Sequence, residues 1–394
     1  MQRNMLEGIR IVDLTSIVFG PYATEILADL GADVIKVEPP EGDVFRRAGA
    51  PAQTPGMGAC HMTLNRGKLS VTLDLKKETD AAKMRDLLAT ADVFIHNVRR
   101  RAIERLGFDY ASVRAINKDI IYTHCVGFGS SGRYRDLPAF DDVIQAATGT
   151  ATLLSRVDGE PRPRYLPSLI ADKVAGLHGA YAVLAAIIHK LRTGEGQLVE
   201  VPMFESFAHF MMQEHLYGAT FISQAYAAGY PRQLDPMRQP FPTADGYISI
   251  VLYTDAVAVR LINLFGDEKL SNDERFAGPQ ERQRHMSELY AEIACRTPAH
   301  TTAEWTKLFE AAQIPSMPMR DLEDLAEDPH LKDVGFFARS EHPTEGAYLS
   351  MKGPVSFSAR PAGKLGPAPT LGEHNDRLEG LLSDARKPLA RSLL

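Results

Sequence analysis

The first 130 residues alternate between short strands and amphipathic helices, and this alternation limits the fold more than any other feature. The segment 9–14, "IRIVDL", has the β-branched composition of a strand. A helix is predicted over 20–31, because Pro21 stands in its first turn and Gly31 just past its end. The segment 32–38, "ADVIKVE", is the next strand. A strand, a helix and a strand in this order predict a βαβ unit and therefore a parallel sheet.

The same alternation continues to residue 203 and predicts one large domain. Further strands are expected at 68–75, 92–97, 119–129 and 197–203, with helices near 79–91 and 101–106 between them. The predicted fold class is α/β, with a Rossmann-like doubly wound large domain and a smaller α/β domain. The predicted boundaries are 1–210 for the N-terminal part of the large domain, 211–240 for a linker, 241–320 for the small domain, and 321–394 for a linker and a C-terminal segment that returns to the large domain.

The composition is that of an ordinary soluble protein. Of 394 residues, 44% are hydrophobic, and the formal net charge of −6 favours neither a nucleic acid nor a membrane as partner. The N-terminal segment lacks the apolar core of a signal peptide, and Asp172 and Lys173 interrupt the most apolar helix. We therefore expect a cytoplasmic protein. Three widely separated cysteines form no CxxC pair, so we expect no metal.

Two common nucleotide-binding fingerprints are missing. A dinucleotide site needs the pattern G-x-G-x-x-G in the first strand–helix turn, but that turn reads "TSIVFGPY" and holds only Gly20. The segment "NRGKLS" is no Walker loop, because no glycine stands five positions before Gly67. A nicotinamide cofactor and a P-loop nucleotide are therefore not expected.

A cluster of four arginines follows the strand at 92–97. Arg99, Arg100 and Arg101 stand where a helix begins, and Arg105 lies one turn later. Positive charge at a helix N-terminus opposes the helix macrodipole, and a bound anion relieves that conflict. The cluster indicates a polyphosphate site, with a solvated run of charges as the alternative.

A series of motifs, in order, then identifies a family resemblance. It includes "GPYATEILADLGADVIKVEPPEGD", "LNRGKLSVTLDLK", "NVRRRAIERLGF", "VGFGSSG", "FDDVIQAATG", "RTGEGQLVEVPMFES", "EDPHLKDVGFF" and "PAPTLGEHND". The chain resembles the family III CoA-transferases, which include formyl-CoA transferase and carnitine CoA-transferase, with α-methylacyl-CoA racemase as a relative. The resemblance extends almost from end to end.

The resemblance implies that coenzyme A binds to the N-terminal α/β domain. The contacts it implies are Val18, Phe19, Leu73, Asp74, Leu75, Lys76, Asn97, Val98, Arg99, Arg105, Val126, Gly127, Phe128 and Gly129. The adenine of CoA needs an apolar slot, and its phosphates need cations. Where family members read N-F-x-P-G this chain reads "NVRRR", and Pro39 stands where formyl-CoA transferases have arginine. We therefore also consider Arg46 and Arg47 for the phosphates.

The resemblance implies Asp172 as the covalent nucleophile. A core stripe is predicted on the long helix that follows it, at Val174, Leu177, Tyr181, Leu184, Ile188 and Leu191. Asp172 is expected at the N-terminal end of this helix, where the macrodipole keeps a carboxylate ionised. Position alone also fits a second interpretation, in which Asp172 is a helix N-cap.

The implied activity is transfer of CoA from an acyl-CoA donor to a carboxylic acid through aspartyl anhydride and aspartyl–CoA thioester intermediates. Coenzyme A as a substrate is the only cofactor expected, backbone N–H groups of "VGFG" are candidates to stabilise the oxyanions, and an interlocked homodimer is implied. Arg232 and Arg238 are candidates to bind an acceptor carboxylate. The region around them lacks a glycine-rich run, which disfavours an oxalate and formate pair.

Two alternatives to a transferase stay open. A racemase needs a second acid or base, which in racemases is a histidine directly before the position of Asp141, and here that residue is Phe140. The other alternative is a protein that binds acyl-CoA without catalysis.

Overall fold

The computed structural model describes residues 4–222, 227–359 and 365–383. Residues 1–3, 223–226, 360–364 and 384–394 lie outside this description, and they include parts of the predicted linker and C-terminal segment. The chain divides into two compact units, and each is described by itself. Unit 1 comprises 1–151, 165–211 and 332–394, and unit 2 comprises 152–164 and 212–331. The domain boundaries predicted from the sequence remain predictions.

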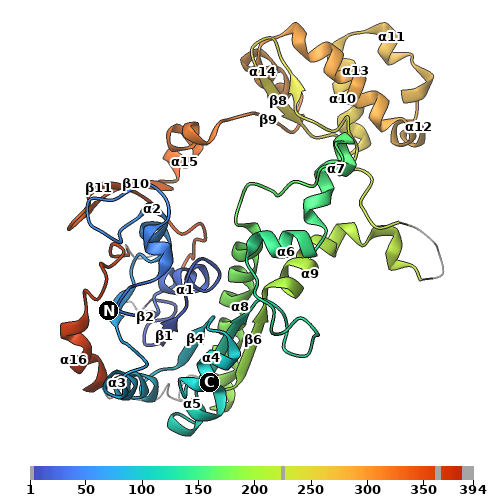
Figure 1. Cartoon of the computed structure of the whole chain (residues 1–394). Helices are drawn as coiled ribbons and strands as arrows, with labels where there is room; N and C mark the ends of the chain where they lie inside the picture. The colour runs from blue at the N-terminus through green and yellow to red at the C-terminus, as the bar shows by residue number, and fades with distance from the viewer. Residues whose placement is uncertain (1–3, 223–226, 360–364, 384–394) are drawn as a thin grey trace. The chain divides into compact units, whose positions relative to one another are not determined.

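Unit 1 is built on a six-stranded parallel sheet, which confirms the predicted α/β class (Figure 1). The strand order is β3-β2-β1-β4-β5-β6, the order of the doubly wound dinucleotide-binding fold. The strands are β1 (Arg10–Leu14), β2 (Asp33–Glu38), β3 (Leu69–Thr72), β4 (Val93–His96), β5 (Ile121–Val126) and β6 (Leu198–Pro202). The order reverses between β1 and β4, so the loops that follow these two strands meet at the switch point, where ligands bind in such sheets.

Helices cover both faces of this sheet. They include α1 (Phe19–Asp29), α2 (Ala59–Leu64), α3 (Glu78–Ala89), α4 (Arg100–Arg105), α5 (Tyr110–Ile116), α6 (Asp141–Ala147), α8 (Ile170–Thr193) and the start of α9 (Met203–His215). Alternate residues of one strand belong to different layers, so Ile11 packs with α1 and α8 while Val12 packs with α3 and α5. Both faces are thus buried, as a parallel sheet requires.

Helix α8 packs against α1 through small residues. A Cβ atom on Gly176 would lie 2.8 Å from the Tyr22 ring, and one on Gly179 would lie 3.2 Å from Ala23. The predicted core stripe is therefore partly wrong. Val174 is buried, but Leu177, Tyr181 and Ile188 are 50%, 58% and 56% exposed. The buried face carries mainly Ala and Gly, because only small side chains allow two helices this close an approach.

The C-terminal segment returns to the sheet of unit 1. His374 accepts a hydrogen bond from the Ser70 N–H at 3.1 Å and donates its own N–H to the Ser70 carbonyl at 2.9 Å, beside the edge strand β3. Helix α16 (Leu378–Ser383) packs near α3, and the Leu381 carbonyl accepts from the fully buried Arg10 at 2.9 Å. A β-hairpin of β10 (Phe337–His342) and β11 (Gly346–Met351) precedes this segment.

Unit 2 is a small helical domain around a three-stranded antiparallel sheet. The sheet has the order β7-β8-β9, with β7 (Phe241–Pro242), β8 (Tyr247–Ile250) and β9 (Ser316–Pro318). The helices are α7 (Leu153–Asp158), α10 (Asp255–Phe265), α11 (Glu268–Ser271), α12 (Pro279–Arg284), α13 (Met286–Arg296) and α14 (Thr302–Ala311). Trp305 and Phe309 lie in the core that these helices enclose.

By length and hydropathy, α8 is the one helix among the described residues that could cross a membrane. A core helix of a soluble protein meets the same criterion. In unit 1 the small-residue face of α8 is packed against α1 and the sheet, which is the environment of a core helix.

Candidate active site

The first turn of α8 is capped by a carboxylate from another helix. Leu169 at the N-cap position makes no side-chain hydrogen bond to the turn. Instead, the N–H groups of Ala171 and Asp172 donate to Oδ1 of Asp141, at 2.7 and 3.1 Å. Asp141 is the first residue of α6 and is buried. The interpretation of Asp172 as an N-cap is therefore wrong, because Asp141 satisfies the free N–H groups of this turn.

Gln145 fixes the Asp141 carboxylate in this position. Its Nε2 donates to Oδ2 of Asp141 at 2.6 Å, and its Oε1 accepts from the Leu166 N–H at 2.9 Å. Gln145 is fully buried and lies one turn after Asp141 on α6. It thus ties α6 to the segment that leads into α8.

The Asp172 side chain is left for other interactions and lies in an unusual environment. It is 7% exposed and close to the Asp141 carboxylate, and the Phe19 N–H at the start of α1 lies next to it. Burial, followed by the charge of Asp141, raises the pKa of Asp172 to about 7, although the Phe19 N–H opposes this change. The expectation that the macrodipole keeps Asp172 fully ionised at neutral pH is wrong, because burial outweighs it.

The loop between β1 and α1 brings three predicted CoA contacts together. Asn97 accepts from the Ser16 N–H at 3.0 Å and donates to the Ser16 carbonyl at 2.9 Å, which joins the loops after β4 and β1. Val18 and Phe19 follow directly in the chain and are buried. Gly20 is needed at the turn into α1, because a Cβ atom there would lie 2.3 Å from Thr15.

A cavity of about 540 Å³ lies beside α3 and α4 and holds three of the predicted contacts. Leu75, Lys76 and Arg105 line it, together with Arg85 and other residues of the two helices. A volume of this size is within the range of ligand pockets. Leu73 lies outside it, buried in the core between the sheet and α3, and its N–H donates to a β2 carbonyl.

The arginines considered for the phosphates differ in their surroundings. Arg46 is unsuited to a phosphate, because it is 2% exposed and forms a bidentate ion pair with Glu38 at 2.7 and 2.6 Å. Arg47 is exposed. In the cluster at the start of α4, Arg100 and Arg101 face carboxylates at 3.6 and 3.9 Å, and the side chains of Arg99 and Arg105 are exposed. Asp74 caps the turn after β3, where it accepts from the Lys76 N–H at 3.2 Å.

The segment "VGFG" follows β5, and one of its N–H groups is occupied. The Gly129 N–H, proposed for an oxyanion, donates to the Glu205 carboxylate at 2.9 Å, so it is not free in this structure. Val126 ends β5, and Phe128 packs on Phe204 in the core. Gly127 lies against Ala139, since a Cβ atom there would lie 2.3 Å from the Ala139 Cβ, two residues before Asp141.

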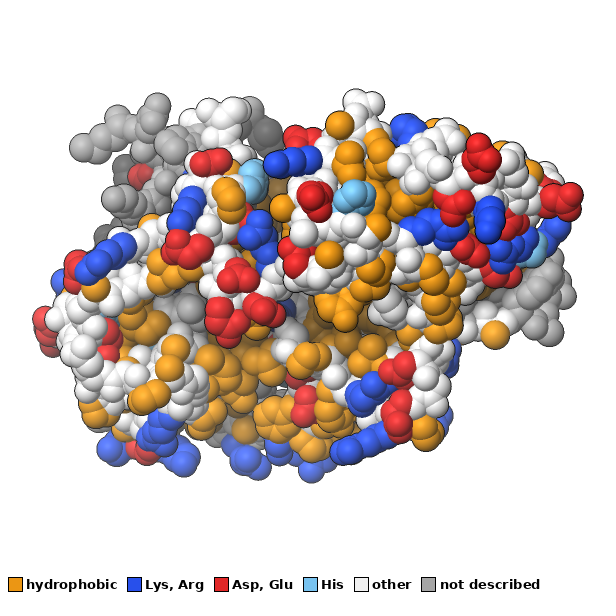
Figure 2. Space-filling model, turned by 90° about the horizontal axis from the view of Figure 1, so that it is seen from above, with side chains coloured by type: hydrophobic (Ala, Val, Ile, Leu, Met, Phe, Trp, Pro, Cys, Tyr) orange, Lys and Arg blue, Asp and Glu red, His pale blue; other side chains and the backbone are white. Residues whose placement is uncertain are grey.

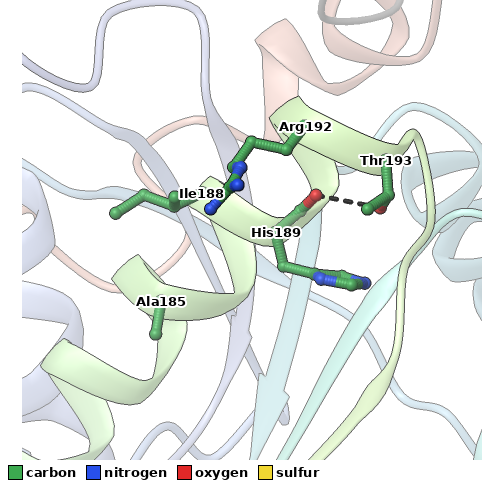
Figure 3. A pocket seen from close by; sticks show the side chains of 5 residues that line it. All are labelled: Ala185, Ile188, His189, Arg192 and Thr193. Atoms are coloured by element: carbon green, nitrogen blue, oxygen red, sulfur yellow. Dashed lines mark hydrogen bonds between the residues drawn. The ribbon is translucent and has the colours of Figure 1, made fainter.

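The cavity in Figure 3 does not belong to this site. Ala185, Ile188, His189, Arg192 and Thr193 line it, and the Thr193 hydroxyl donates to the His189 carbonyl at 2.9 Å. These residues stand at the C-terminal end of α8, about 25 Å along the helix from Asp172 at a rise of about 1.5 Å per residue. None of the predicted site residues lines this cavity.

In unit 2, Arg232 and Arg238 line one small cavity of about 110 Å³. Gln239, Ser249 and Tyr290 also line it, and no carboxylate among the described residues does. The Arg232 guanidinium lies over the Tyr253 ring, 5.2 Å from its centre. Other arginines of this unit, such as Arg282 and Arg296, form ion pairs with aspartates at 2.6 and 2.5 Å. A cavity with two guanidinium groups and no acid suits a small carboxylate.

Similar proteins place the chain in a family. The model of CoA-transferase family III matches residues 6–375. The succinate–glutarate CoA-transferase of Agrobacterium fabrum is 31% identical over 378 residues, which cover 94% of this chain and 93% of that protein. The succinyl-CoA:mesaconate CoA-transferase of Haloarcula marismortui is 30% identical, with 95% of each chain covered. The crystal structure of a CAIB/BAIF family protein from Brucella suis matches with a TM-score of 0.83 at 30% identity, covering 97% of this chain and 100% of that one.

The chain belongs to CoA-transferase family III. The resemblance read from the sequence is thereby confirmed, and the activity is CoA transfer between an acyl-CoA and a carboxylate. The individual site residues stay predictions. Of these, Val18, Phe19, Asn97 and Asp172 converge at the β1–β4 switch point and the start of α8, and Leu75, Lys76 and Arg105 share a cavity.

Sequence reasoning missed two residues of this family III site. In the sequence Asp141 marks only the residue after the missing racemase histidine, although in the structure it caps α8 and lies close to Asp172. Gln145, four residues later on the same helix, was not considered. The signal was the spacing "DDVIQ", because positions i and i+4 of a helix lie on one face.

Proposed function

We propose that this family III CoA-transferase uses Asp172 as its covalent nucleophile. The observation that carries this proposal is a carboxylate that is almost fully buried, faces Asp141, and has a pKa raised to about 7. A carboxylate of higher pKa is a stronger nucleophile, and desolvation removes the water that must otherwise leave before attack. Near neutral pH a large share of Asp172 is still ionised and able to attack.

The environment also favours the acylated state of Asp172. Acylation converts the carboxylate into a neutral anhydride or thioester. This removes a buried negative charge from beside Asp141, whose repulsion is one cause of the raised pKa. The covalent intermediate thus relieves an unfavourable interaction of the free enzyme, which lowers the barrier to its formation.

The proposed reaction has four balanced steps. An Asp172 oxygen attacks the thioester carbonyl of the donor, the C–S bond breaks, and CoA leaves as a thiolate. The thiolate attacks the aspartyl carbonyl of the anhydride, the C–O bond breaks, and the donor acid leaves as a carboxylate. The acceptor carboxylate attacks the aspartyl–CoA thioester and expels the thiolate again. The thiolate attacks the acceptor acyl carbonyl, which yields the new acyl-CoA and free Asp172.

Coenzyme A is the only cofactor in this proposal, and it enters as a substrate. Its phosphates bind near Lys76, Arg99 and Arg105, whose side chains are exposed on one side of the sheet. Val18 and Asn97 stand at the switch point between this region and Asp172. The Phe19 N–H, which contacts the Asp172 carboxylate, is available to an oxyanion that forms on it.

We propose dicarboxylic acids as the substrate class. The two relatives described above are named for succinate, glutarate and mesaconate, and within unit 2 the Arg232–Arg238 cavity offers guanidinium groups to a small carboxylate. A panel of mono- and dicarboxylic acceptors with succinyl-CoA tests this. Arg238→Gln is expected to raise the KM for a dicarboxylate about tenfold and leave that for a monocarboxylate unchanged, because one ionic contact is lost. Equal KM changes for both classes would argue against the assignment.

We further propose a cytoplasmic homodimer in which the chains interlock. The exposed Leu177, Tyr181 and Ile188 side chains of α8 support an interface, since large apolar side chains rarely stay exposed together. Hydrophobic side chains gather over much of the surface seen in Figure 2. Native mass spectrometry should give twice the chain mass of 43.4 kDa. A monomer at micromolar concentration would contradict this part of the proposal.

Trapping the intermediate tests the nucleophile directly. The enzyme is mixed with succinyl-CoA and quenched with hydroxylamine, which converts an aspartyl thioester or anhydride into a hydroxamate. Peptide mass spectrometry should find the hydroxamate on Asp172 and on no other carboxylate. Asp142, exposed on the first turn of α6, serves as the internal control. Label at another residue, with Asp172 unmodified, would refute the proposal.

A further inference from the structure

The loop between β1 and α1 contains a strained residue. Ile17 has φ of 72°, in the left-handed region. A β-branched side chain at positive φ is a genuine outlier and strains the backbone. Such a conformation persists only where the surroundings hold it, and here it stands two residues before Phe19, whose N–H contacts Asp172.

Three consecutive loop residues are each held by a different side chain. Lys36 donates to the Thr15 carbonyl at 2.8 Å, and Asn97 holds both polar groups of Ser16. The Ile17 N–H donates to both oxygens of Asp43, at 3.2 Å each. The partners come from β2, from the loop after β4 and from the residue before the 3₁₀ helix η1 (Val44–Arg47). The loop is therefore fixed from three directions.

Asp43 and Lys36 form the buried part of this support. The Lys36 ammonium lies 3.1 Å from the Asp43 carboxylate, and both residues are at most 6% exposed. Asp43 is in turn fixed by its own N–H, which donates to Glu38 at 3.1 Å. Since an ion pair in such a place has a high desolvation cost, it is not explained by stability alone. Its geometric effect is to keep an acceptor beneath the Ile17 N–H.

We propose that Asp43 is a positioning residue of the transfer reaction. Together with Lys36 it holds Ile17 in the left-handed conformation, and the loop then presents the Phe19 N–H to the Asp172 carboxylate. The inference rests on the proposed role of Asp172. Asp43 contacts no reacting atom itself, and its contribution is the placement of a hydrogen-bond donor at the nucleophile and at the oxyanion formed on it.

The test is a double-mutant cycle between Asp43 and Ile17. Asp43→Ala removes the acceptor, so we expect kcat to fall by about 10–100-fold, the usual effect of a misplacement of about 1 Å, with the KM for acyl-CoA changed less than about threefold. Ile17→Gly is expected to keep nearly full activity, because glycine adopts positive φ without strain. In the double variant the residue at position 17 adopts positive φ without support from Asp43. The value of kcat should therefore recover about fivefold or more over that of Asp43→Ala.

A matched control separates positioning from stability. Asp109 also accepts N–H groups at a helix start, from Ala111 and Ser112 at 3.0 and 3.2 Å, and is not itself a predicted site residue. Asp109→Ala should lower the urea midpoint and leave kcat unchanged. If Asp43→Ala also lowers only the urea midpoint, or if Ile17→Gly fails to restore kcat, the positioning role is refuted.

A readout without turnover keeps this inference apart from the proposed function. The ¹³C carboxyl titration of Asp172, assigned by comparison with Asp172→Asn, should be displaced in Asp43→Ala and return in the double variant. An unchanged titration in Asp43→Ala would overturn the inference even in a fully active enzyme. Transfer by Asp172→Asn would instead overturn the proposed nucleophile, whatever the titration shows.

Discussion

Two of the aspartates that unit 1 buries, Asp13 and Asp172, have opposite surroundings. Asp13 in β1 is fully buried, and burial alone would raise its pKa, but Lys68 and Lys36 more than offset this and lower it. Its oxygens also accept hydrogen bonds from the hydroxyls of Thr15 and Thr24, and Lys68 lies 3.4 Å away. Asp172 is nearly as buried, but the groups that shift its pKa are Asp141 and the Phe19 N–H, and its pKa rises to about 7.

The comparison shows that burial does not by itself define a reactive carboxylate. A buried charge that cations neutralise is a structural element, because its ionised form is the stable one. A buried carboxylate next to a second carboxylate is unstable as an anion and gains from any reaction that removes its charge. Asp172 belongs to the second kind, and each of the following variants changes one side of this contrast.

The largest expected effect is the loss of transfer in Asp172→Asn. The amide keeps the shape of the side chain but removes the nucleophilic oxygen, so kcat should fall by about 10⁴-fold or more. CoA binding, measured by isothermal titration, should stay within about threefold, because the phosphate contacts are untouched. Asp142→Asn, on the exposed side of α6, is the control and should retain activity. An active Asp172→Asn would remove the distinction between the two aspartates.

Asp13→Asn should affect stability instead. Without Asp13, the buried Lys68 loses its only charged partner within 4 Å in the described residues, so the free energy of unfolding should fall by about 3–5 kcal/mol. Urea unfolding followed by circular dichroism measures this. The control is Asp158→Asn, where an exposed ion pair with Arg164 is lost, and no measurable change is expected. Equal effects of the two variants would show that Asp13 is not a structural charge.

Asp172→Asn should have the opposite effect on stability, with a defined pH dependence. The pKa of Asp172 in the folded chain, about 7, lies above its ordinary value of 3.8, so the folded state holds a proton that the unfolded state has lost. The stabilisation present at pH 4 is therefore lost as the pH rises to 7. At pH 8 the variant should be more stable than the wild type by about 4 kcal/mol, and at pH 4 the two should be nearly equal. A difference that shrinks as the pH rises would contradict the raised pKa.

The smallest expected effect comes from Asp141→Asn. The variant keeps an oxygen for the N–H groups of Ala171 and Asp172 but removes the neighbouring charge. The pKa of Asp172 should fall, and the acidic limb of the kcat–pH profile should move down by about one unit, or about 1.4 kcal/mol. Gln145→Ala removes the hydrogen bond to Asp141 without changing charge and serves as the control. If both variants move the profile equally, the geometry of Asp141 matters and its charge does not.

Most of the large sheet could be predicted from the sequence, because its signals are local. β-Branched runs and the positions of Pro21 and Gly31 place β1, α1 and β2 within a few residues of their observed bounds. The orientation of α8 could not be predicted in the same way. Leu177, Tyr181 and Ile188 have helical spacing and predict a buried stripe, yet the Gly and Ala face is buried, because the distance between α1 and α8 selects the side chains that fit.

The site could be predicted only where the family resemblance or a strand end marked it. These two signals predicted Asp172, Asn97 and Phe19. The structure brings the three residues to one edge of the sheet. The partners that set the chemistry come from distant segments: Asp141 is 31 residues from Asp172, and Asp43 is 26 residues from Ile17. No periodicity links such pairs, since only the folded chain brings them within hydrogen-bond distance.

The hydrogen bond between Arg10 and the Leu381 carbonyl has a consequence for biosynthesis. It joins residues 371 positions apart, and Arg10 stands in β1, the first of the six strands of the large sheet in chain order. Unit 1 is also interrupted by all of unit 2. Strand β1 therefore waits for one of its partners until residue 381 has been synthesised, while residues 212–331 have already emerged and can fold. A nascent chain released before residue 381 lacks this contact, so premature termination leaves an incomplete sheet for chaperones and proteases to recognise.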